Sequence, residues 1–513
     1  MLNDHKVLQG GQLFIIDGDL NQIRCDALLI PTDIGFGFTR LWRRSLREGC
    51  VLRVKDLVKH NWFVVKDPLE VEGSHQLWFG NVGNRSFDHG EYVRVAEEFV
   101  RQAADSLHRT VKHPVLALNI LGTGAGGKRD DKGQLLQLLV NKLTDAAVEH
   151  SVDVVLVCWG RKQYSAARRA EQRNPSLVPT SSVLNRPDVK SKVLELAEHS
   201  LRNRLVHFVG AGVSSSAGLP SWQSLLDEIA KSTDLPDEIL SRLYELDVRD
   251  QAKILVSKIS STKYFESLNK MLSQQHYSLL HGLIASLHPS EIVTTNYDHL
   301  LEMAVGTEDQ PSVLPGNAVS ENGRWILKLH GTLDNPDSIV LTRDDYLNLP
   351  QNSGALFGIV QAMLMTKHML FTGYSLTDDS FHRVIHEVRR ARPGHAGSKI
   401  GTVFTLFEDS LLNELWGEDL DIIHMLPTPK PEDRQEAIAI ASRELAIVLN
   451  QICRYSANPS EFLLDDTYES MLDDRERELK ALLLQLQNLS DNNHLISKYV
   501  QSLLSPLSRE DKL

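Results

Sequence analysis

The sequence predicts an α/β protein with two domains, the second built on a parallel sheet, and a helical C-terminal tail. First, the 513 residues exceed the length at which a single hydrophobic core usually stops growing. Second, short continuous apolar runs, typical of buried strands, alternate with longer segments whose apolar residues recur at helical spacing. Third, glycine-rich turns follow two of the apolar runs, as they do in the connections of parallel sheets.

The first domain covers residues 1–180. Its apolar runs predict four buried strands, at residues 12–16, 25–30, 115–121 and 153–159. Helical spacing of apolar residues predicts helices at residues 90–107 and 133–148. Residues 166–191 lose this periodicity and collect Pro, Ser, Asn and Arg, which predicts an interdomain linker.

Two motifs in the first domain carry a family resemblance. The stretch GDLNQIRCDALLIPTD (residues 18–33) resembles the opening of a macro domain, the ADP-ribose-binding fold. NILGTGAGG (residues 119–127) resembles the phosphate-cradling loop of that family. Macro-domain hydrolases have an asparagine after the second strand, whereas this chain has Asp33 and no asparagine there. Hydrolysis of ADP-ribosyl groups is therefore not implied. An ADP-ribose-binding domain and a degenerate domain whose glycines only turn the chain both stay open.

The second domain covers residues 190–430 and is organised around a strand, a glycine turn and a helix. The apolar run 205–209 is followed by Gly210-Ala211-Gly212 and then by small polar residues that include Ser214. Glycines let the backbone approach a ligand closely, and a helix N-terminus offers N–H groups to phosphate. The turn has neither the GxGxxG spacing nor the Gly-Lys-Ser/Thr of a P-loop, so on its own it is not specific.

Three later apolar strands also end in residues that can bind a ligand. Asn296 and Asp298 follow the run that begins at residue 292, and His330 follows the run that begins at residue 326. Gly373 and Ser375 follow the third run. Because ligands gather at the carboxyl ends of parallel strands, we expect these residues and the glycine turn to form one shared site.

Taken in order, these four motifs resemble those of the sirtuin family. GAGVSSSAGLPSW is similar to the sirtuin NAD loop, and TTNYD to the Gln-Asn-Ile-Asp motif. LHG is similar to the segment with the catalytic histidine, and GYS to the ribose contact. The resemblance covers about residues 193–427. It implies a Rossmann-like domain with a small helical insertion, for which the chain between Ala230 and Glu291 has a suitable length.

The resemblance implies that NAD is the ligand, bound as a substrate. Asn296 and His330 would be the catalytic residues, and a histidine suits general-base chemistry near neutral pH. The other positions carried over from the family would bind NAD: Gly210, Ala211, Gly212, Ser214, Asp298, Gly373 and Ser375. Taken singly, each has a plainer interpretation, because Asn, Asp and Gly commonly build turns.

We expect no metal in this site. Deacylating sirtuins usually carry a four-cysteine zinc module after the catalytic histidine, which is missing here. The four cysteines are widely scattered and form no C-x-x-C pair: Cys25, Cys50, Cys158 and Cys453. His382 and His386 lie four residues apart on a predicted helix without a third ligand, and Asp378 and Asp379 are expected to cap that helix.

The missing zinc module and the lack of an arginine after Pro220 indicate an activity other than deacylation. In these features the chain resembles zinc-less bacterial sirtuins of antiphage defence, which hydrolyse NAD to ADP-ribose and nicotinamide. The resemblance implies an NAD+ hydrolase that acts as an abortive-infection effector. The alternatives are an NAD-dependent protein deacylase or ADP-ribosyltransferase, and a non-catalytic NAD or ADP-ribose sensor subunit. It also implies a homo-oligomer, with a partner ATPase or a phage-derived activator as candidate partners.

Composition and charge fit this interpretation. The formal net charge of −12 argues against direct binding to nucleic acid or to an anionic membrane. The sequence has no apolar stretch near the roughly 18 residues of a membrane span and no signal-peptide pattern, so we expect a cytoplasmic protein. Residues 431–513 are expected to form a helical C-terminal region whose charged faces are solvated or make oligomer contacts.

Overall fold

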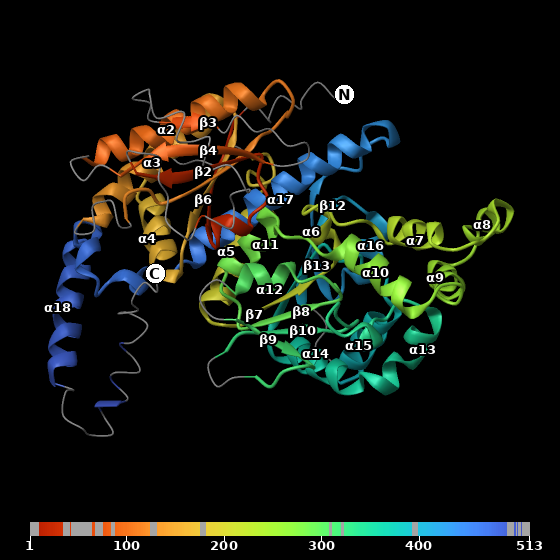
Figure 1. Cartoon of the computed structure of the whole chain (residues 1–513). Coiled ribbons are helices and arrows are strands. Elements are labelled where there is room, and N and C mark those ends of the chain that lie inside the picture. Colours follow the sequence, from red (N-terminus) through yellow and green to blue (C-terminus); the bar gives the residue numbers. More distant parts are fainter. Residues whose placement is uncertain are drawn as a thin grey trace. The chain divides into compact units, whose positions relative to one another are not determined.

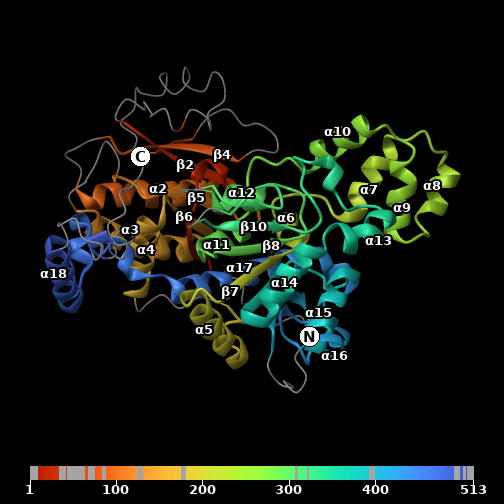
Figure 2. The same cartoon turned by 90° about the horizontal axis from the view of Figure 1, so that it is seen from below.

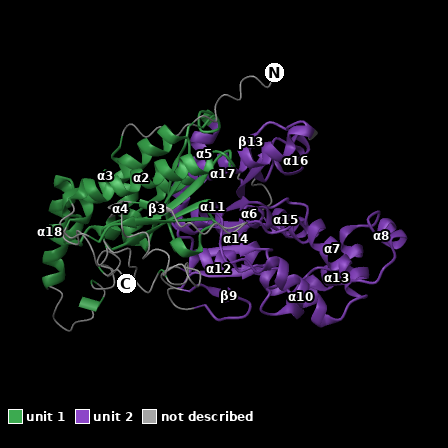
Figure 3. Ribbon diagram, turned by 45° about the horizontal axis from the view of Figure 1, so that its top comes forward, with its two compact units in different colours: residues 1–187, 450–513 green, residues 188–449 purple. Residues whose placement is uncertain are grey.

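The computed structural model divides into two compact units (Figure 3). Unit 1 contains residues 1–187 and 450–513, and unit 2 contains residues 188–449. The structure describes residues 10–33, 42, 64–66, 75–83, 88–123, 131–174, 181–306, 310–319, 323–391, 399–489, 497–498, 500 and 504. Within these ranges, no helix combines the length and the hydropathy that a membrane crossing requires.

Unit 1 is built on a six-stranded sheet with the strand order β1-β6-β5-β2-β4-β3. Five strands run parallel, and β3 pairs antiparallel with β4. The strands are β1 (Leu13–Asp17), β2 (Ala27–Thr32), β3 (Val64–Lys66), β4 (Gln76–Asn81), β5 (Val115–Asn119) and β6 (Asp153–Cys158). The four strands expected from apolar runs are confirmed as β1, β2, β5 and β6. Continuous burial explains their clear signal, since all six residues of β6 are buried.

The helices of unit 1 confirm two predictions and correct a third. The expected helices are present as α2 (His89–Leu107) and α3 (Lys132–His150). The linker expected at residues 166–191 is wrong at its start, because α4 (Arg161–Gln172) extends into it as far as Gln172. The error has a physical reason. Arg168 and Glu171 of α4 are buried as an ion pair, so charged residues occupy the buried face of this helix, where helical periodicity predicts apolar residues. Residues 124–130 of the glycine loop lie outside the described residues.

Residues after Asn450 belong to unit 1, although the sequence suggested a separate helical region. They form short helices η6 (Pro459–Phe462) and η7 (Asp466–Met471) and helix α18 (Asp474–Leu489). Phe462 and Met471 are part of the same hydrophobic core as α2 and α3. The fully buried Arg168 guanidinium donates to Glu171 Oε2 (2.9 Å), to the Ile15 carbonyl (2.6 Å) and to Asn450 Oδ1 (2.9 Å). Packing and this buried charge therefore join the two ends of the chain.

Replacing Arg168 with methionine is expected to lower the free energy of unfolding by about 3–5 kcal/mol, because it leaves the buried Glu171 carboxylate without its cation. Urea titration of the full chain measures the change. The matched control is Arg101→Met, which breaks an exposed pair with Glu98 and should cost less than about 1 kcal/mol. Equal losses in the two variants would contradict a stabilising role for the buried network.

Unit 2 contains an all-parallel, seven-stranded sheet with the order β13-β12-β11-β7-β8-β10-β9. Most of its strands are labelled in Figure 1. All six strand pairings are parallel. The strands are β7 (Leu205–Val209), β8 (Glu291–Thr294), β9 (Ser312–Leu314), β10 (Trp325–Lys328), β11 (His368–Thr372), β12 (Gly401–Phe407) and β13 (Leu420–Leu426). The α/β class with a Rossmann-like parallel sheet is thus confirmed.

Helix α5 (Pro187–Leu201) precedes the first strand of this sheet, and further helices connect the strands. The connecting helices include α6 (Ala211–Ser215), α11 (Leu279–Ser286), α12 (Leu300–Val305), α13 (Arg343–Asn352), α14 (Gly354–Thr366), α15 (Asp379–Ala391) and α16 (Ser410–Trp416). Helix α17 (Arg434–Ser456) follows β13, and its residues from Asn450 onward are assigned to unit 1. The helical insertion expected between Ala230 and Glu291 is present as α8 (Asp237–Leu243), α9 (Val248–Val256) and α10 (Ser261–Leu272). The preceding helix α7 (Trp222–Lys231) packs against α9 and α10. Figure 2 shows these four helices gathered beside α13.

Candidate functional site

The four strands that carry the sequence motifs are neighbours in the sheet, in the order β11-β7-β8-β10. Gly373 and Gly210 directly follow β11 and β7. Asn296 and His330 come two residues after the ends of β8 and β10. Because all four strands are parallel, these residues lie along one edge of the sheet. The strand order reverses at β7, because strands that come later in the chain lie on both sides of it in the sheet. Open parallel sheets bind ligands at such a point.

The glycines of the first motif let two turns pack closely. The N–H groups of Gly210 and Gly212 donate to the carbonyl oxygens of Thr372 (3.0 Å) and Gly373 (2.9 Å). A Cβ atom on Gly210 would lie 2.4 Å from the Gly373 oxygen. These two N–H groups thus bind the neighbouring turn, instead of facing a phosphate as we had expected. Ala211 begins the short helix α6 and is exposed.

Replacing Gly373 with alanine is expected to destabilise unit 2 by at least about 2 kcal/mol. Gly373 has a φ of +65°, and an added Cβ would lie 2.5 Å from the Val213 nitrogen. Thermal unfolding of the full chain measures the effect. Gly358→Ala is the control, since Gly358 lies in α14 with open space around it, and that change should stabilise by up to about 1 kcal/mol. A Gly373→Ala chain as stable as wild type would contradict the close packing.

Asn296 has an amide whose orientation is fixed by its neighbours. Its Nδ2 donates to the Gly210 carbonyl (3.2 Å) and to Ser214 Oγ (3.0 Å). A carbonyl oxygen can only accept, so the amide nitrogen must face Gly210. The Oδ1 atom on the other side is buried and has no hydrogen-bond partner in the structure. A buried acceptor without a partner is costly, and such an atom is often reserved for a ligand or water.

Ser214 and Asp298 continue the hydrogen-bond network that begins at Asn296. Ser214 Oγ donates to Asp298 Oδ2 at 2.9 Å, and both residues are buried. Asp298 Oδ1 accepts from the Leu300 backbone N–H at 3.0 Å. Burial raises the pKa of Asp298 above its ordinary value, even though these donors favour the charged form. The Ser214 hydroxyl is therefore committed to protein groups and organises the turn around Asn296.

A buried lysine binds the backbone of the turn that carries Asn296 and Asp298. Lys328, the last residue of β10, donates to the backbone carbonyls of Asp298 (2.6 Å) and Tyr297 (3.2 Å). Its Nζ also lies 2.6 Å from Glu302 Oε1, and the lysine side chain is 1% exposed. The sequence does not indicate this lysine as a site residue, because it stands inside an apolar run. It connects the turn after β8 to the strand that carries His330.

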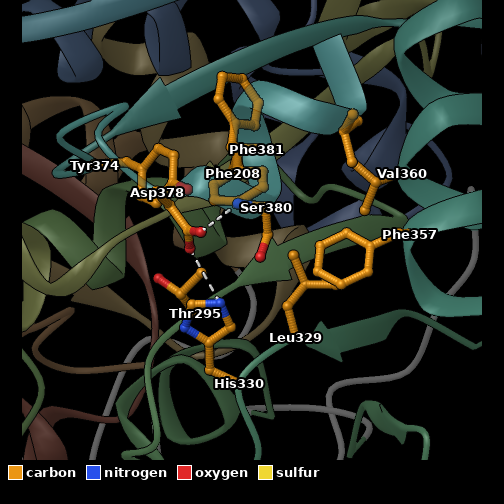
Figure 4. Close-up of a pocket in the computed structure, with 11 residues that line it drawn as sticks. Phe208, Thr295, Leu329, His330, Phe357, Val360, Tyr374, Asp378, Ser380 and Phe381 are labelled. Atoms are coloured by element: carbon orange, nitrogen blue, oxygen red, sulfur yellow. Dashed lines mark hydrogen bonds and ion pairs between the residues drawn. The ribbon is translucent and has the colours of Figure 1, made fainter. Parts of the chain in front are cut away.

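His330 is paired with an acidic residue that the sequence suggested only as a helix cap. His330 Nε2 lies 3.1 Å from Asp378 Oδ2, and both side chains are largely buried (Figure 4). Asp378 also accepts from the Ser380 N–H (2.8 Å), so it does cap α15 as expected. Burial alone would raise the pKa of Asp378, but the neighbouring His330 imidazole holds it below its ordinary value. Asp379 is exposed and pairs with Arg249 at 2.6 Å.

A small, mainly apolar pocket lies against the His330–Asp378 pair (Figure 4). It is lined by Phe208, Thr295, Leu329, His330, Phe357, Val360, Tyr374, Asp378, Ser380, Phe381 and Val384. Ser375 is not among these residues. It is exposed, and its hydroxyl lies 2.7 Å from that of Thr377. The pocket thus places the histidine beside apolar and aromatic side chains that exclude water.

The described residues contain one group of three side chains close enough to share a metal ion: Glu195, His199 and His368. His368 is the first residue of β11, so this group lies at the opposite end of that strand from the site. The two imidazole rings stack 4.7 Å apart at 10°. An ion held by imidazole nitrogen lies close to the ring plane, so one ion cannot suit both rings unless one of them turns. His368 Nε2 already lies 2.9 Å from Thr402 Oγ1.

Comparisons with known proteins find relatives of unit 2. Residues 290–422 match the family model described as SIR2-like domain, which includes the turns with Asn296, His330 and Asp378. The chain is 28% identical over 207 residues to "Defense-associated sirtuin 2" of Bacillus subtilis, covering 39% of this chain and 20% of the relative. It is 30% identical over 217 residues to "NAD(+) hydrolase ThsA" of Enterococcus faecium, covering 39% of this chain and 43% of the relative.

A further relative is "NAD(+) hydrolase ThsA" of Bacillus cereus (strain MSX-D12), at 24% identity over 216 residues, covering 40% of this chain and 44% of the relative. The chain therefore spans less than half the length of these three relatives. The sirtuin resemblance is confirmed for the SIR2-like region. The family match lies outside residues 1–180, and the macro-domain resemblance stays a prediction.

Proposed function

We propose that this chain is an NAD+ hydrolase of sirtuin-like type, which converts NAD+ and water to ADP-ribose, nicotinamide and a proton. The observation that carries the proposal is a pair of polar groups that follow the ends of β8 and β10. These are the unpartnered Asn296 Oδ1 and the His330 ring beside Asp378. The SIR2-like match over this region and the names of the relatives support the choice of NAD as the substrate.

The reaction requires activation of a weak nucleophile, water, and stabilisation of a positively charged sugar. When the bond between nicotinamide and ribose C1′ breaks, nicotinamide leaves with the bonding electron pair and the ribose becomes oxocarbenium-like. Asn296 Oδ1 would accept a hydrogen bond from the attacking water and orient its oxygen toward C1′. His330, held through Nε2 by Asp378, would use its second ring nitrogen to accept the proton released by water or by a ribose hydroxyl.

The remaining residues would hold the rest of NAD. Ala211, exposed at the start of α6, would face the pyrophosphate, while Gly210 and Gly212 would hold the turn beside it through their bonds to Thr372 and Gly373. Gly373 and Ser375 would lie along the adenosine half. Ser214 and Asp298 would act on NAD through Asn296, because their side chains bind each other. Under this proposal no metal takes part.

Nicotinamide release from NAD by the purified full chain, without any peptide, tests the proposed function. We expect release at an unchanged rate when an acetyl-lysine peptide is added, with ADP-ribose as the other product. Release only in the presence of the peptide, with an O-acyl-ADP-ribose product, would replace the proposal with deacylation. NAD binding without any release, with or without peptide, would favour the sensor alternative.

We also propose that NAD hydrolysis serves antiphage defence, which the name of the Bacillus subtilis relative supports. Bacteria that express the chain should lose NAD after phage infection, while cells that express an Asn296→Ala chain should keep it. Assembly into a homo-oligomer, and activation by a phage product or a partner ATPase, belong to the same proposal. Sedimentation of the full chain with and without lysate from infected cells tests assembly. Calorimetry of the full chain with ADP-ribose tests a regulatory site in unit 1.

A further inference from the structure

We propose that His281 is a positioning residue that fixes the hydroxyl of Ser214, and through it the amide of Asn296, for attack on NAD. This inference rests on the proposed function and adds a residue that the sequence did not single out. His281 lies in α11, is fully buried and belongs to none of the four strand-end motifs. Among the described site residues, it is Ser214 to which His281 is hydrogen-bonded.

The neighbours of His281 allow only one tautomer. Its Nδ1 lies 3.3 Å from the Ser278 backbone nitrogen, whose N–H can only donate, so Nδ1 must be an acceptor. Ser278 Oγ lies 2.8 Å from the same nitrogen and is placed to donate as well. Burial, partly offset by the charge of Glu302, lowers the pKa of His281 to about 3. The ring is therefore neutral near pH 7, and its one N–H proton is on Nε2.

That proton points at Ser214. His281 Nε2 lies 3.4 Å from Ser214 Oγ, a long hydrogen bond. The same oxygen accepts from Asn296 Nδ2 (3.0 Å) and gives its own proton to Asp298 (2.9 Å). A hydroxyl has one proton and two lone pairs, so these three bonds use its whole capacity. The Ser214 hydroxyl consequently cannot turn to offer its proton to Asn296.

Together with the Gly210 carbonyl, which accepts from the same Nδ2, this restriction keeps the Asn296 amide in one orientation. If Ser214 instead donated to Asn296 Oδ1, the amide would have to flip, its Nδ2 would leave the Gly210 carbonyl, and the acceptor proposed for the attacking water would be lost. With His281 in place, both amide protons of Asn296 are used by Ser214 and Gly210, and Oδ1 keeps no protein partner. His281 thus prepares the acceptor without itself contacting NAD.

Two substitutions of His281 separate positioning from structural support. In His281→Gln, the longer amide can still donate to Ser214 Oγ in place of Nε2. In His281→Asn, the amide oxygen can replace Nδ1 and keep the bond from the Ser278 N–H, but the side chain is too short to reach Ser214. We measure kcat and KM for nicotinamide release, and the thermal midpoint of unfolding. His382→Gln, at an exposed histidine of α15, is the control.

We expect His281→Asn to lower kcat by about 10-fold or more, with a KM change below about 3-fold, because the geometry of attack is lost while NAD still binds. His281→Gln should recover most of kcat. A purely structural residue would instead change kcat and the thermal midpoint together, in both variants alike. Equal kcat in the Gln and Asn variants would overturn the proposal.

Two measurements on the full chain do not depend on turnover and remain decisive if the wild type releases no nicotinamide. Nitrogen NMR of histidine-labelled chain, with the His281 signals assigned by their loss in His281→Gln, should show the Nε2–H tautomer without titration from about pH 5 upward. An Nδ1–H tautomer would overturn the proposal. Hydrogen exchange of the Asn296 side-chain amide should be faster in His281→Asn than in wild type or His281→Gln, and equal exchange in all three would also overturn it.

Discussion

Replacing Asn296 with alanine will lower kcat for NAD hydrolysis by about 10²–10³-fold, the usual effect of removing one polar group aimed at the reacting atoms. The change removes the unpartnered Oδ1 and leaves the Gly210 carbonyl and Ser214 Oγ without their common donor. NAD affinity should change by less than about 10-fold, because this acceptor acts mainly on water in the transition state. Nicotinamide release and calorimetry with NAD measure the two quantities.

Asn352→Ala is the matched control for this substitution. Asn352 is exposed at the end of α13 in the same unit, so its loss should leave kcat and stability unchanged. A kcat loss below about 3-fold in the Asn296→Ala chain would remove Asn296 from the mechanism. A loss accompanied by an equal loss of NAD binding and a lower thermal midpoint would assign Asn296 to the support of the turn instead.

Replacing Asp378 with asparagine will lower kcat by about 10²-fold or more, the order seen when the carboxylate that orients a catalytic histidine is neutralised. Asparagine keeps the shape of the side chain and is an equally good helix cap, so the hydrogen bond from the Ser380 N–H should persist. The substitution therefore isolates the charge that faces His330. Asp379→Asn, at the exposed neighbour that pairs with Arg249, is the control and should keep wild-type kcat.

The same variant gives a pH test with a defined sign. The pKa of Asp378 is lower in the folded chain than its ordinary value. Its carboxylate therefore contributes stability that is fully present above the unfolded pKa of about 3.9 and is lost as the pH falls through the folded value. Wild type should be more stable than Asp378→Asn at pH 7, and this difference should shrink in acid. A difference that is constant from neutral to strongly acidic pH would contradict the charge pairing.

The sequence alone was sufficient for the strands that carry the site. β7, β8, β10 and β11 are mainly buried, mainly apolar strands of four or five residues, and each is followed within two residues by a glycine, an asparagine or a histidine. Both signals are local, so they can be seen without knowing which strands are neighbours. β3 and β9, with three residues each, gave too short a pattern.

The partners of the site residues could not be found in this way. Asp378 stands 48 residues after His330 and satisfies a local role as the cap of α15, so nothing in its surroundings indicates a histidine. His281 is hidden in an apolar stretch that leads into β8 and looks like a core residue. Its role depends on Ser214, 67 residues earlier. Hydrogen bonds of this kind are chosen by three-dimensional packing, not by periodicity.

What the sequence by itself determined about this protein is its α/β class, the parallel sheet of the second domain and the order of the four strand-end motifs. These follow from side-chain hydropathy and from the conformational preferences of glycine, which act over a few residues. The tertiary structure alone decided that β11, β7, β8 and β10 are adjacent, that Asp378 faces His330, and that residues after Asn450 join unit 1. These depend on burying apolar surface and pairing buried polar groups between residues far apart in the chain, and only the folded chain brings such residues together.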